Sequence, residues 1–205
     1  MQHESDERAR LRRGLRAQRA GLDETTRQRV AEVVSERLLS LPALRAGGPV
    51  AGYRAIRGEV DVDGVLEALA VSGVEVTVPR VVGEHLEFVV WTPAARSRAG
   101  AFGIREPADG ETVPFAEHAV VLAPLVAFDR VGNRLGQGGG YYDRAIGSCA
   151  EFRPVIIGVA HAFQEVDAVP VERWDEPIDA VVTERAMVEF TPGATKSLPS
   201  GHRTR

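Results

Sequence analysis

A glycine-rich stretch in the second half of the chain combines the residue types best suited to hold a phosphate. The segment RLGQGGGYYDR, residues 134–144, places four glycines in five positions and follows them with Tyr141, Tyr142 and Asp143. Backbone N–H groups of such a loop can approach a phosphate closely, and flanking arginines can pair with its oxygens. Asp143 is a hard oxygen ligand of the kind that Mg²⁺ prefers. These features favour a nucleotide–Mg²⁺ site, and a strand-to-helix turn with a purely structural role is the alternative.

The loop does not match two common phosphate-binding motifs. A Walker A loop needs G-x-x-x-x-G-K-[ST], and Lys196, far from the loop, is the only lysine in the chain. The dinucleotide pattern G-x-G-x-x-G fails at Tyr141 when it is started from Gly136. Started from Gly138, it fails at Asp143. Phosphate contacts must therefore come from arginine or backbone groups, and neither nicotinamide binding nor P-loop chemistry is indicated.

Apolar runs around the loop predict the strands that must position it. Residues 119–129 form a continuous apolar run that ends just before the loop, and residues 154–161 form another. Such runs are typical of strands buried on both faces of a parallel sheet. Shorter strands are predicted at 49–55, 74–79, 86–91 and 178–184. Residues 92–118 show no clear element, and we expect this long segment to close over a substrate.

Helical patterns between the strands complete an α/β pattern. Helices are predicted at 5–21, 23–41, from about 61 and at 140–146, with Asp23 as the N-cap of the second. We therefore expect a single α/β domain over residues 1–190, with a mainly parallel sheet flanked by helices in a Rossmann-like layered fold. Residues 191–205 lack any period and are expected to be a disordered tail.

The predicted topology also indicates where a ligand would bind. In open α/β sheets, ligands lie at the carboxyl ends of the strands. The glycine loop follows the buried strand at 119–129, and Glu59 follows the strand at 49–55, so both are expected at that edge. Asp179 differs, because the pattern places it inside its own short strand.

Composition bounds the class of protein. The chain has 205 residues, 44% of them hydrophobic, and a net charge of −4, so its whole surface is not suited to attract nucleic acid. The single cysteine allows no intrachain disulfide and fits a reducing compartment. No apolar run approaches the roughly 20 residues of a membrane helix, and the first residues lack the apolar core of a signal peptide. We expect a cytoplasmic protein without a membrane partner.

Five blocks of the sequence resemble one family. The segment PLVAFDRVGNRLGQGGGYYDR is similar to the signature of the 5-formyltetrahydrofolate cyclo-ligase family, also called methenyltetrahydrofolate synthetases. Four further blocks resemble family segments in the same order, and together they span nearly the whole chain: RARLRRGLRAQRAGL, RGEVD, GAFGIREP and GVAHAFQEVDAVPVERWDEPIDAVVTE. Five blocks in order are far more specific than any one of them.

The resemblance implies an ATP-hydrolysing ligase that forms a carbon–nitrogen bond. The implied reaction closes 5-formyltetrahydrofolate into 5,10-methenyltetrahydrofolate, with ATP as co-substrate and Mg²⁺ as cofactor, and releases ADP and phosphate. The formyl oxygen is a poor leaving group until it is phosphorylated, and N10 can then add to the carbon. The protein would supply positioning and charge stabilisation. Small molecules are thus the expected partners, and a monomer is the expected state.

The resemblance also assigns roles to individual residues. The implied ATP contacts are Arg8, Arg12, Arg134, Gly136, Gly138, Gly139, Gly140 and Tyr142. The implied catalytic residues are Arg134 and Asp143, and the implied Mg²⁺ ligands are Asp143 and Asp179. The implied folate contacts are Glu59, Arg54, Phe102, Gln137 and Tyr141.

Several of these residues also have a structural interpretation. Asp179 could be a surface charge at the end of a strand, and Glu59 could offset the dipole of the helix that starts near residue 61. Arg8 and Arg12 could belong to a solvated basic face, and Phe102 could pack in the core.

Three positions depart from the family pattern. Arg8 replaces the usual lysine of the first helix. Gln137 stands where many members have a basic or aromatic residue, and Gly139 stands where some have lysine. These changes leave room for altered substrate use.

Two other functions stay open at this point. A phosphate-binding enzyme of the sugar-phosphate isomerase type would use the glycine loop without hydrolysing ATP. A non-enzymatic module could bind RNA through the six arginines of residues 8–19, although no aromatic residues alternate with them.

Overall fold

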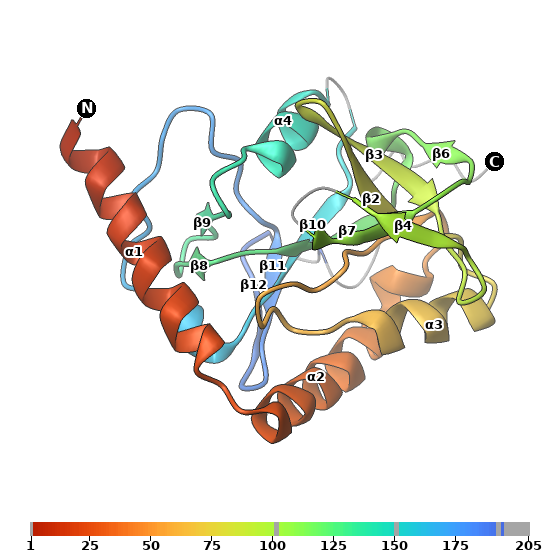
Figure 1. Cartoon of the computed structure of the whole chain (residues 1–205), viewed down its shortest axis with the longest axis horizontal. Helices are drawn as coiled ribbons and strands as arrows, with labels where there is room; N and C mark the ends of the chain where they lie inside the picture. Colours follow the sequence, from red (N-terminus) through yellow and green to blue (C-terminus); the bar gives the residue numbers. More distant parts are fainter. Residues whose placement is uncertain (1, 101–102, 150–151, 192–193, 195–205) are drawn as a thin grey trace.

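A mixed eight-stranded sheet forms the centre of the protein (Figure 1). The structure, a computed structural model, describes residues 2–100, 103–149, 152–191 and 194. In sheet order the strands are β12 (Met187–Glu189), β11 (Ala180–Val182), β10 (Val155–Val159), β7 (Val120–Pro124), β1 (Val50–Ala51), β2 (Val76–Val82), β3 (His85–Val90) and β6 (Thr112–Val113). The five strands from β11 to β2 run parallel, and β12, β3 and β6 pair antiparallel at the two edges.

Helices cover both faces of this sheet. Helices α2 (Glu24–Leu39) and α3 (Asp63–Val71) pack on one face, and α4 (Tyr141–Gly147) packs on the other. Helix α1 (Gln2–Ala20) lies to one side of the molecule, apart from these layers (Figure 1). The layered α/β fold with a mainly parallel sheet is confirmed. No helix within the described ranges is long and apolar enough to cross a membrane.

The sequence explains why these elements form. Asp23 caps α2, because its Oδ1 accepts a hydrogen bond of 2.8 Å from the backbone N–H of Thr26, as predicted. Val30, Val34 and Leu38 then recur at a spacing of four residues and are buried against the sheet. All five residues of β10 are buried, as the continuous apolar run predicted for a strand covered on both faces.

The run at 119–129 is not a single strand, which corrects that prediction. Strand β7 ends at Pro124, and the chain continues into a separate hairpin of β8 (Ala127–Phe128) and β9 (Arg134–Leu135). The hairpin turn is held by Asp129, whose carboxylate accepts hydrogen bonds from the backbone N–H groups of Val131 and Asn133. This hairpin leads directly into the glycine loop.

Residues 92–118 also differ from the prediction, since they contain short elements. Strands β4 (Ser97–Ala99) and β5 (Arg105–Pro107) form a two-stranded sheet, and β6 and the 3₁₀ turn η3 (Phe115–Glu117) follow. Strands of two or three residues are too short to show an alternating pattern, which is why the sequence did not reveal them. Two other 3₁₀ turns are η1 (Pro42–Arg45) and η4 (Ala162–Gln164).

Helix α1 docks on the hairpin rather than on the main sheet. Leu11 and Leu15 of α1 pack against a small cluster that contains Ala127, Leu135 and Val169. This contact brings the arginine-rich face of α1 beside the glycine loop. The main sheet therefore positions the loop from one side, and α1 closes it from the other.

Candidate active site

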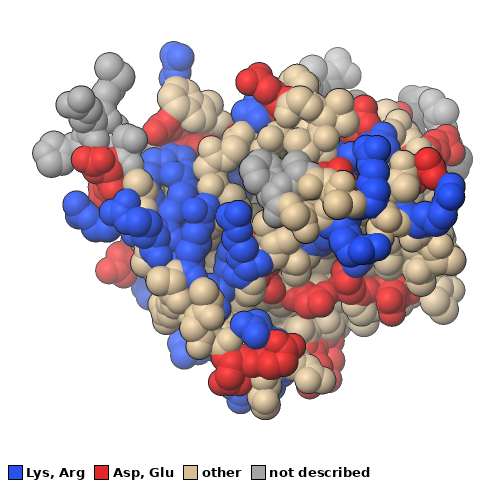
Figure 2. Space-filling view, viewed as in Figure 1, with Lys and Arg blue, Asp and Glu red and all other residues tan. Residues whose placement is uncertain are grey.

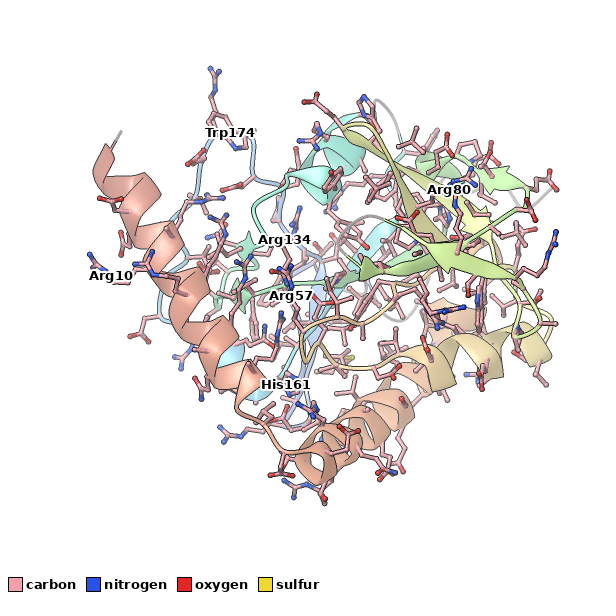
Figure 3. The ribbon with its side chains drawn as sticks, viewed as in Figure 1. Arg10, Arg57, Arg80, Arg134, His161 and Trp174 are labelled. Carbon is pink, nitrogen blue, oxygen red and sulfur yellow. The ribbon has the colours of Figure 1, made fainter. Side chains whose placement is uncertain are left out.

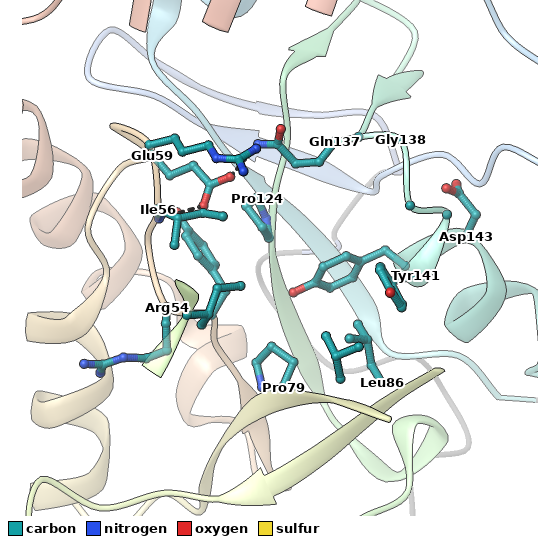
Figure 4. A pocket seen from close by; sticks show the side chains of 18 of the residues that line it. Arg54, Ile56, Glu59, Pro79, Leu86, Pro124, Gln137, Gly138, Tyr141 and Asp143 are labelled. Carbon is teal, nitrogen blue, oxygen red and sulfur yellow. Dashed lines mark hydrogen bonds between the residues drawn. The ribbon is translucent and has the colours of Figure 1, made fainter. Parts of the chain in front are cut away.

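A cavity lies beyond the carboxyl ends of the central strands, where the topology predicted a ligand, and we call it the main cavity because of this position. It has a volume of about 400 Å³ and is lined by the segments that follow β1, by β2 and β5, and by the glycine loop (Figure 4). Its apolar lining includes Ile56, Pro79, Leu86 and Pro124. An apolar hollow with a few polar groups at its ends is typical of a site for an organic ring system.

The glycine loop separates this cavity from a second hollow. The second cavity, of about 270 Å³, is lined by Arg8, Arg12, Trp174 and the segment around Asp175. Residues common to both cavities are Gly136, Gly138, Gly140 and Asp143. A ligand in each cavity would therefore meet the other ligand at this loop.

Two glycines of the loop have backbone angles that other residues rarely adopt. Gly138 has a φ of 104° and Gly140 has a φ of 65°. Gly140 is the residue before α4, so the left-handed turn allows the chain to enter this helix directly after the loop. The glycines are thus required by the path of the backbone as well as by any close approach of a ligand.

Arginines of α1 hold the outer side of the loop. Arg12 Nε donates to the carbonyl oxygen of Gly136 at 2.9 Å. Arg16 donates to the side-chain oxygen of Gln137 at 2.8 Å and to its backbone carbonyl at 2.6 Å. Arg8 is buried and pairs with Asp175 through two hydrogen bonds. The predicted contacts Arg8 and Arg12 are therefore brought to the loop, although each already has a protein partner.

The pair of Arg134 and Asp143 lies at the inner side of the loop. Arg134 is only 3% exposed, and its Nη2 donates to Asp143 Oδ1 at 2.6 Å. The backbone N–H of Glu176 donates to the same oxygen at 3.1 Å. Within the described residues, Arg134 Nε is buried without a hydrogen-bond partner. A buried cation with an unused donor is suited to an anionic ligand.

Glu59 lies at another wall of the main cavity. Its carboxylate accepts from Gln137 Nε2 at 2.7 Å and from the backbone N–H of Ile56 at 3.1 Å (Figure 4). Burial raises the pKa of Glu59, and the nearby cation of Arg19 opposes this rise most strongly. The structure thus brings Glu59 and Gln137, two predicted folate contacts, into direct contact.

Two tyrosines follow the glycine loop. Both Tyr141 and Tyr142 line the main cavity. The Tyr142 hydroxyl is buried without a hydrogen-bond partner in the described part of the chain, and burial raises its pKa. The guanidinium of Arg144 lies 5.1 Å from the centre of the Tyr141 ring.

Arg54 lines the main cavity but its charged end is already engaged. Its Nη1 donates to Asp63 Oδ1 at 2.9 Å, and its guanidinium lies 5.7 Å from the centre of the Trp91 ring. Figure 4 shows this end of Arg54 turned away from the centre of the cavity. Phe102, another predicted folate contact, lies outside the described residues.

The structure does not bring Asp179 to the glycine loop. Asp179 precedes β11 instead of lying inside it, and it lines neither cavity. Its carboxylate accepts from Arg153 at 2.7 Å, from the Thr191 hydroxyl at 2.8 Å and from the Ile156 N–H at 2.8 Å. These contacts lie at the amino end of the parallel strands, away from the loop that follows β9.

Sequence reasoning missed a buried carboxylate in the main cavity. Glu106 lines the cavity, is 3% exposed and accepts from the backbone N–H of Val81 at 3.2 Å. A Cβ atom on Gly100 would lie 2.1 Å from the Glu106 carboxyl carbon, so the glycine makes room for it. The position of Glu106 within the GIREP block, which resembles a family segment, could have indicated it.

The α1 arginines beyond Arg12 were also missed. Arg8, Arg12, Arg16 and Arg19 are spaced by three or four residues and therefore share one face of the helix. This spacing was visible in the sequence. Figure 3 shows Arg134 and Arg57 between α1 and the sheet, whereas Arg10 lies on the outer side of α1.

Comparisons with known proteins show the family of this chain. The model of the 5-formyltetrahydrofolate cyclo-ligase family matches residues 4–184. The 5-formyltetrahydrofolate cyclo-ligase of Escherichia coli (strain K12) is 31% identical over 181 residues, which cover 86% of this chain and 100% of that protein. The NMR structure of Aquifex aeolicus 5,10-methenyltetrahydrofolate synthetase is similar with a TM-score of 0.80 and 35% identity, covering 97% of this chain and 99% of that one. The chain therefore belongs to the 5-formyltetrahydrofolate cyclo-ligase family.

Proposed function

We infer that this family member, an ATP-dependent ligase, closes 5-formyltetrahydrofolate into 5,10-methenyltetrahydrofolate at the glycine loop. The observation that carries this proposal is the loop's position between two cavities, one apolar and one lined by arginines. A folate ring in the first cavity and a nucleotide in the second would present their reacting groups to each other at the shared wall. The isomerase and RNA-binding alternatives are not favoured by the comparisons.

The second cavity is the proposed nucleotide site. Backbone N–H groups of residues 136–140 would bind the terminal phosphates, with Arg8, Arg12 and Arg134 supplying positive charge. The Arg8 and Arg12 side chains are held in place by Asp175 and by the loop itself, so little side-chain freedom is lost on binding. Tyr142 lines the main cavity beside the loop, and its hydroxyl, which has no hydrogen-bond partner among the described residues, would donate to the terminal phosphate where the two cavities meet.

Asp143 is the residue we propose to hold Mg²⁺. The described residues contain no group of three or more His, Cys, Asp or Glu side chains that could hold a metal by themselves. Mg²⁺ commonly takes one or two carboxylates and completes its shell with phosphate and water, so a single carboxylate beside a nucleotide fits. The two hydrogen bonds recorded to Asp143 both go to Oδ1. Bound there, Mg²⁺ would neutralise charge on the phosphates.

The main cavity is the proposed folate site. Glu59 would accept hydrogen bonds from N–H groups of the pterin ring, with Gln137 fixing the carboxylate that it contacts at 2.7 Å. Tyr141, Pro79 and Leu86 offer apolar surface to the ring. Arg54 and Phe102 are also proposed folate contacts. Arg54 would contribute the part of the cavity wall that lies beside Trp91.

The chemistry transfers a phosphoryl group and then expels it. The formyl oxygen attacks the γ-phosphorus as the bond to ADP breaks, which gives an O-phosphorylated iminium. N10 adds to the formyl carbon and loses its proton, and the carbon–oxygen bond then breaks to release inorganic phosphate. Arg134 would stabilise the charge that develops on the phosphoryl oxygens, and the loop would align the two reactants.

A direct assay tests this proposal. The protein is mixed with Mg-ATP and 5-formyltetrahydrofolate, and near-ultraviolet absorbance is followed for the methenyl product. We expect product to form only when ATP, Mg²⁺ and folate are all present. Absence of product with protein that binds both substrates would contradict the proposal.

Other properties stay predictions of the sequence. These are the single domain over residues 1–190, the monomeric state, the cytoplasmic location and the absence of a nucleic-acid partner. Figure 2 shows basic side chains gathered over α1, the region in which RNA binding was considered. Sedimentation of the purified protein with and without RNA would test both the monomer and the absence of this partner.

A further inference from the structure

Arg19, near the end of α1, is buried to an unusual degree for a cation. It is 1% exposed, and by residue volume it is the largest fully buried side chain in the described part of the protein. A buried guanidinium is unfavourable unless its N–H groups and its charge are matched. Arg19 was not among the predicted site residues, and its burial requires an explanation.

The contacts of Arg19 connect α1 to two segments of the main cavity. Its Nε donates to the carbonyl oxygen of Arg57 at 3.0 Å, and its Nη1 donates to that of Leu125 at 3.3 Å. Its Nη2 lies 3.8 Å from Glu59 Oε1 and has no hydrogen-bond partner among the described residues. Arg57 follows β1 and Leu125 follows β7, so Arg19 binds the carboxyl ends of two central strands together.

The segment that carries Glu59 is shaped around Arg19. Arg57 has a φ of 51°, a left-handed angle that is strained for a residue with a side chain. Gly58 has a φ of 76°, and a Cβ atom there would lie 3.0 Å from the carbonyl oxygen of Arg19. His161 Nε2 lies 2.9 Å from the Gly58 carbonyl oxygen. The strained turn thus contacts both Arg19 and His161.

We propose that Arg19 is a positioning residue for folate binding, which fixes the turn at 56–59 and directs the Glu59 carboxylate into the main cavity. The proposal rests on the proposed function, in which Glu59 accepts hydrogen bonds from the pterin ring. Arg19 itself does not line either cavity and would act through Glu59.

The charges around Glu59 give the proposal a pH signature. Burial raises the Glu59 pKa, and Arg19 is the strongest opposing influence. The other groups that face Glu59 are the cations Arg57 and Arg16, the donors Gln137 and the Ile56 N–H, and the hydroxyls of Tyr53 and Tyr142. Without Arg19, burial is less opposed and the Glu59 pKa rises further. Folate binding that needs the carboxylate is lost as the pH falls through this pKa, so the loss moves to higher pH.

The first experiment measures the ionisation of Glu59 without any folate. The side-chain carboxyl carbon of Glu59 is followed by NMR as the pH changes in the wild type and in Arg19→Met. We expect the Glu59 pKa to rise in the variant, because the cation that opposes the effect of burial is gone. Arg13→Met is the control, because Arg13 is an exposed arginine of the same helix, and it should leave the pKa unchanged. An unchanged pKa in folded Arg19→Met would overturn the proposal.

The second experiment measures 5-formyltetrahydrofolate binding by calorimetry over the same pH range. We expect Arg19→Met to bind about 10-fold more weakly at pH 7, because the turn that carries Glu59 is no longer held in its binding conformation. The acid loss of affinity should shift to higher pH, and Arg13→Met should match the wild type. On a Glu59→Gln background, Arg19→Met should no longer shift the pH dependence. A shift that persists there would show that Arg19 does not act through Glu59.

Two further results separate folding from positioning. Thermal unfolding shows whether Arg19→Met is folded. If it is not, Arg19→Lys is used instead, because lysine keeps the positive charge but lacks the several N–H donors of the guanidinium. We expect this variant to keep the pH dependence and to lose affinity, and wild-type affinity would overturn the proposal. A wild-type protein that binds no folate contradicts the proposed function, while the NMR titration still decides the effect of Arg19 on Glu59.

Discussion

The two ends of the parallel sheet carry similar ion pairs of arginine and aspartate, but these pairs differ in their other hydrogen-bond partners. At the carboxyl end, Arg134 pairs with Asp143 beside the glycine loop. At the amino end, Arg153 pairs with Asp179, which also accepts from the Thr191 hydroxyl and the Ile156 N–H. Four buried side-chain polar atoms in the described residues lack a hydrogen-bond partner. Three lie at the carboxyl end, on Arg19, Arg134 and Tyr142, and one, on Arg153, lies at the amino end.

This difference indicates which carboxylate serves a ligand. Buried donors and acceptors are nearly always paired in native proteins, so unused ones mark where a partner is expected. Asp143 borders both cavities and lies at the same end of the sheet as the unused polar atoms of Arg134 and Tyr142. Asp179, in contrast, accepts hydrogen bonds from three donors of the protein itself. We therefore propose a ligand-binding role for Asp143 and a structural role for Asp179, although the sequence suggested Mg²⁺ binding for both.

The largest effect is expected at the carboxyl end, from Asp143→Asn. The change removes the charge that would hold Mg²⁺ but keeps an oxygen that can accept from Arg134 and the Glu176 N–H. We expect formation of the methenyl product to fall at least ~100-fold, with the melting temperature nearly unchanged. Absorbance assays and thermal unfolding measure the two quantities. Activity near that of the wild type would remove Asp143 from the metal site.

The matched change at the amino end, Asp179→Asn, should give the opposite result. An amide cannot accept from all three donors, so at least one buried hydrogen bond is lost near the start of β10. We expect the free energy of unfolding to fall by about 1–3 kcal/mol. Product formation per folded molecule should stay within about twofold of the wild type. Denaturant unfolding measures the stability, and the absorbance assay measures product formation. A selective loss of Mg²⁺-dependent activity would instead indicate that Asp179 binds the metal.

Two glycines of the loop sharpen the comparison within the carboxyl end. Gly138→Ala places a side chain at a φ of 104°, which costs about 1–2 kcal/mol, and we expect ~10-fold weaker binding of Mg-ATP. Gly136→Ala is the control, because its φ is ordinary and a Cβ there would lie 3.5 Å from Arg134 Nη1, a normal contact distance. Calorimetric titration with a non-hydrolysable ATP analogue compares the two. Equal affinities would show that the loop's backbone path does not matter for the nucleotide.

The smallest effect concerns the pair of Arg8 and Asp175. Burial opposes ionisation of Asp175, but hydrogen bonds from Arg8 and the Glu172 N–H outweigh it and lower the pKa of Asp175 below its usual 3.8. A lowered pKa stabilises the folded state above that value, and the contribution is lost as the pH falls through the lowered pKa. Because the amide oxygen of Asn can still accept from Arg8, Asp175→Asn should reduce stability by about 1 kcal/mol at pH 6, and the difference should shrink towards pH 3. Denaturant unfolding at both pH values would show a constant difference if this account is wrong.

The sequence was most informative where the physics is local. The apolar run behind β10 and the Asp23 cap depend on residues close in the chain, and the structure confirms both. The run at 119–129 correctly indicated the buried strand β7 but not its end at Pro124. The glycine loop could be recognised from its own residues for the same reason. The hairpin of β4 and β5 was missed, because strands of three residues leave no period to detect.

The roles of charged residues depended on distant partners and could not be read in this way. The sequence does not show that Asp179 accepts hydrogen bonds from Arg153 and Thr191, the contacts on which its proposed structural role rests. Arg19 resembles a solvated arginine until its burial against Glu59 is known, 40 residues away in the chain. In both cases the deciding contact lies between segments that the sequence does not place side by side.

The central claim is that amides of the glycine loop bind the nucleotide's phosphates beside Asp143. The most direct test is an NMR titration of the full chain with a non-hydrolysable ATP analogue and Mg²⁺, following the backbone N–H signals. The account predicts the largest shifts at Gly138, Gly139 and Gly140, and much smaller ones in Asp143→Asn. Nucleotide binding that shifts other signals and leaves these three unmoved would contradict it.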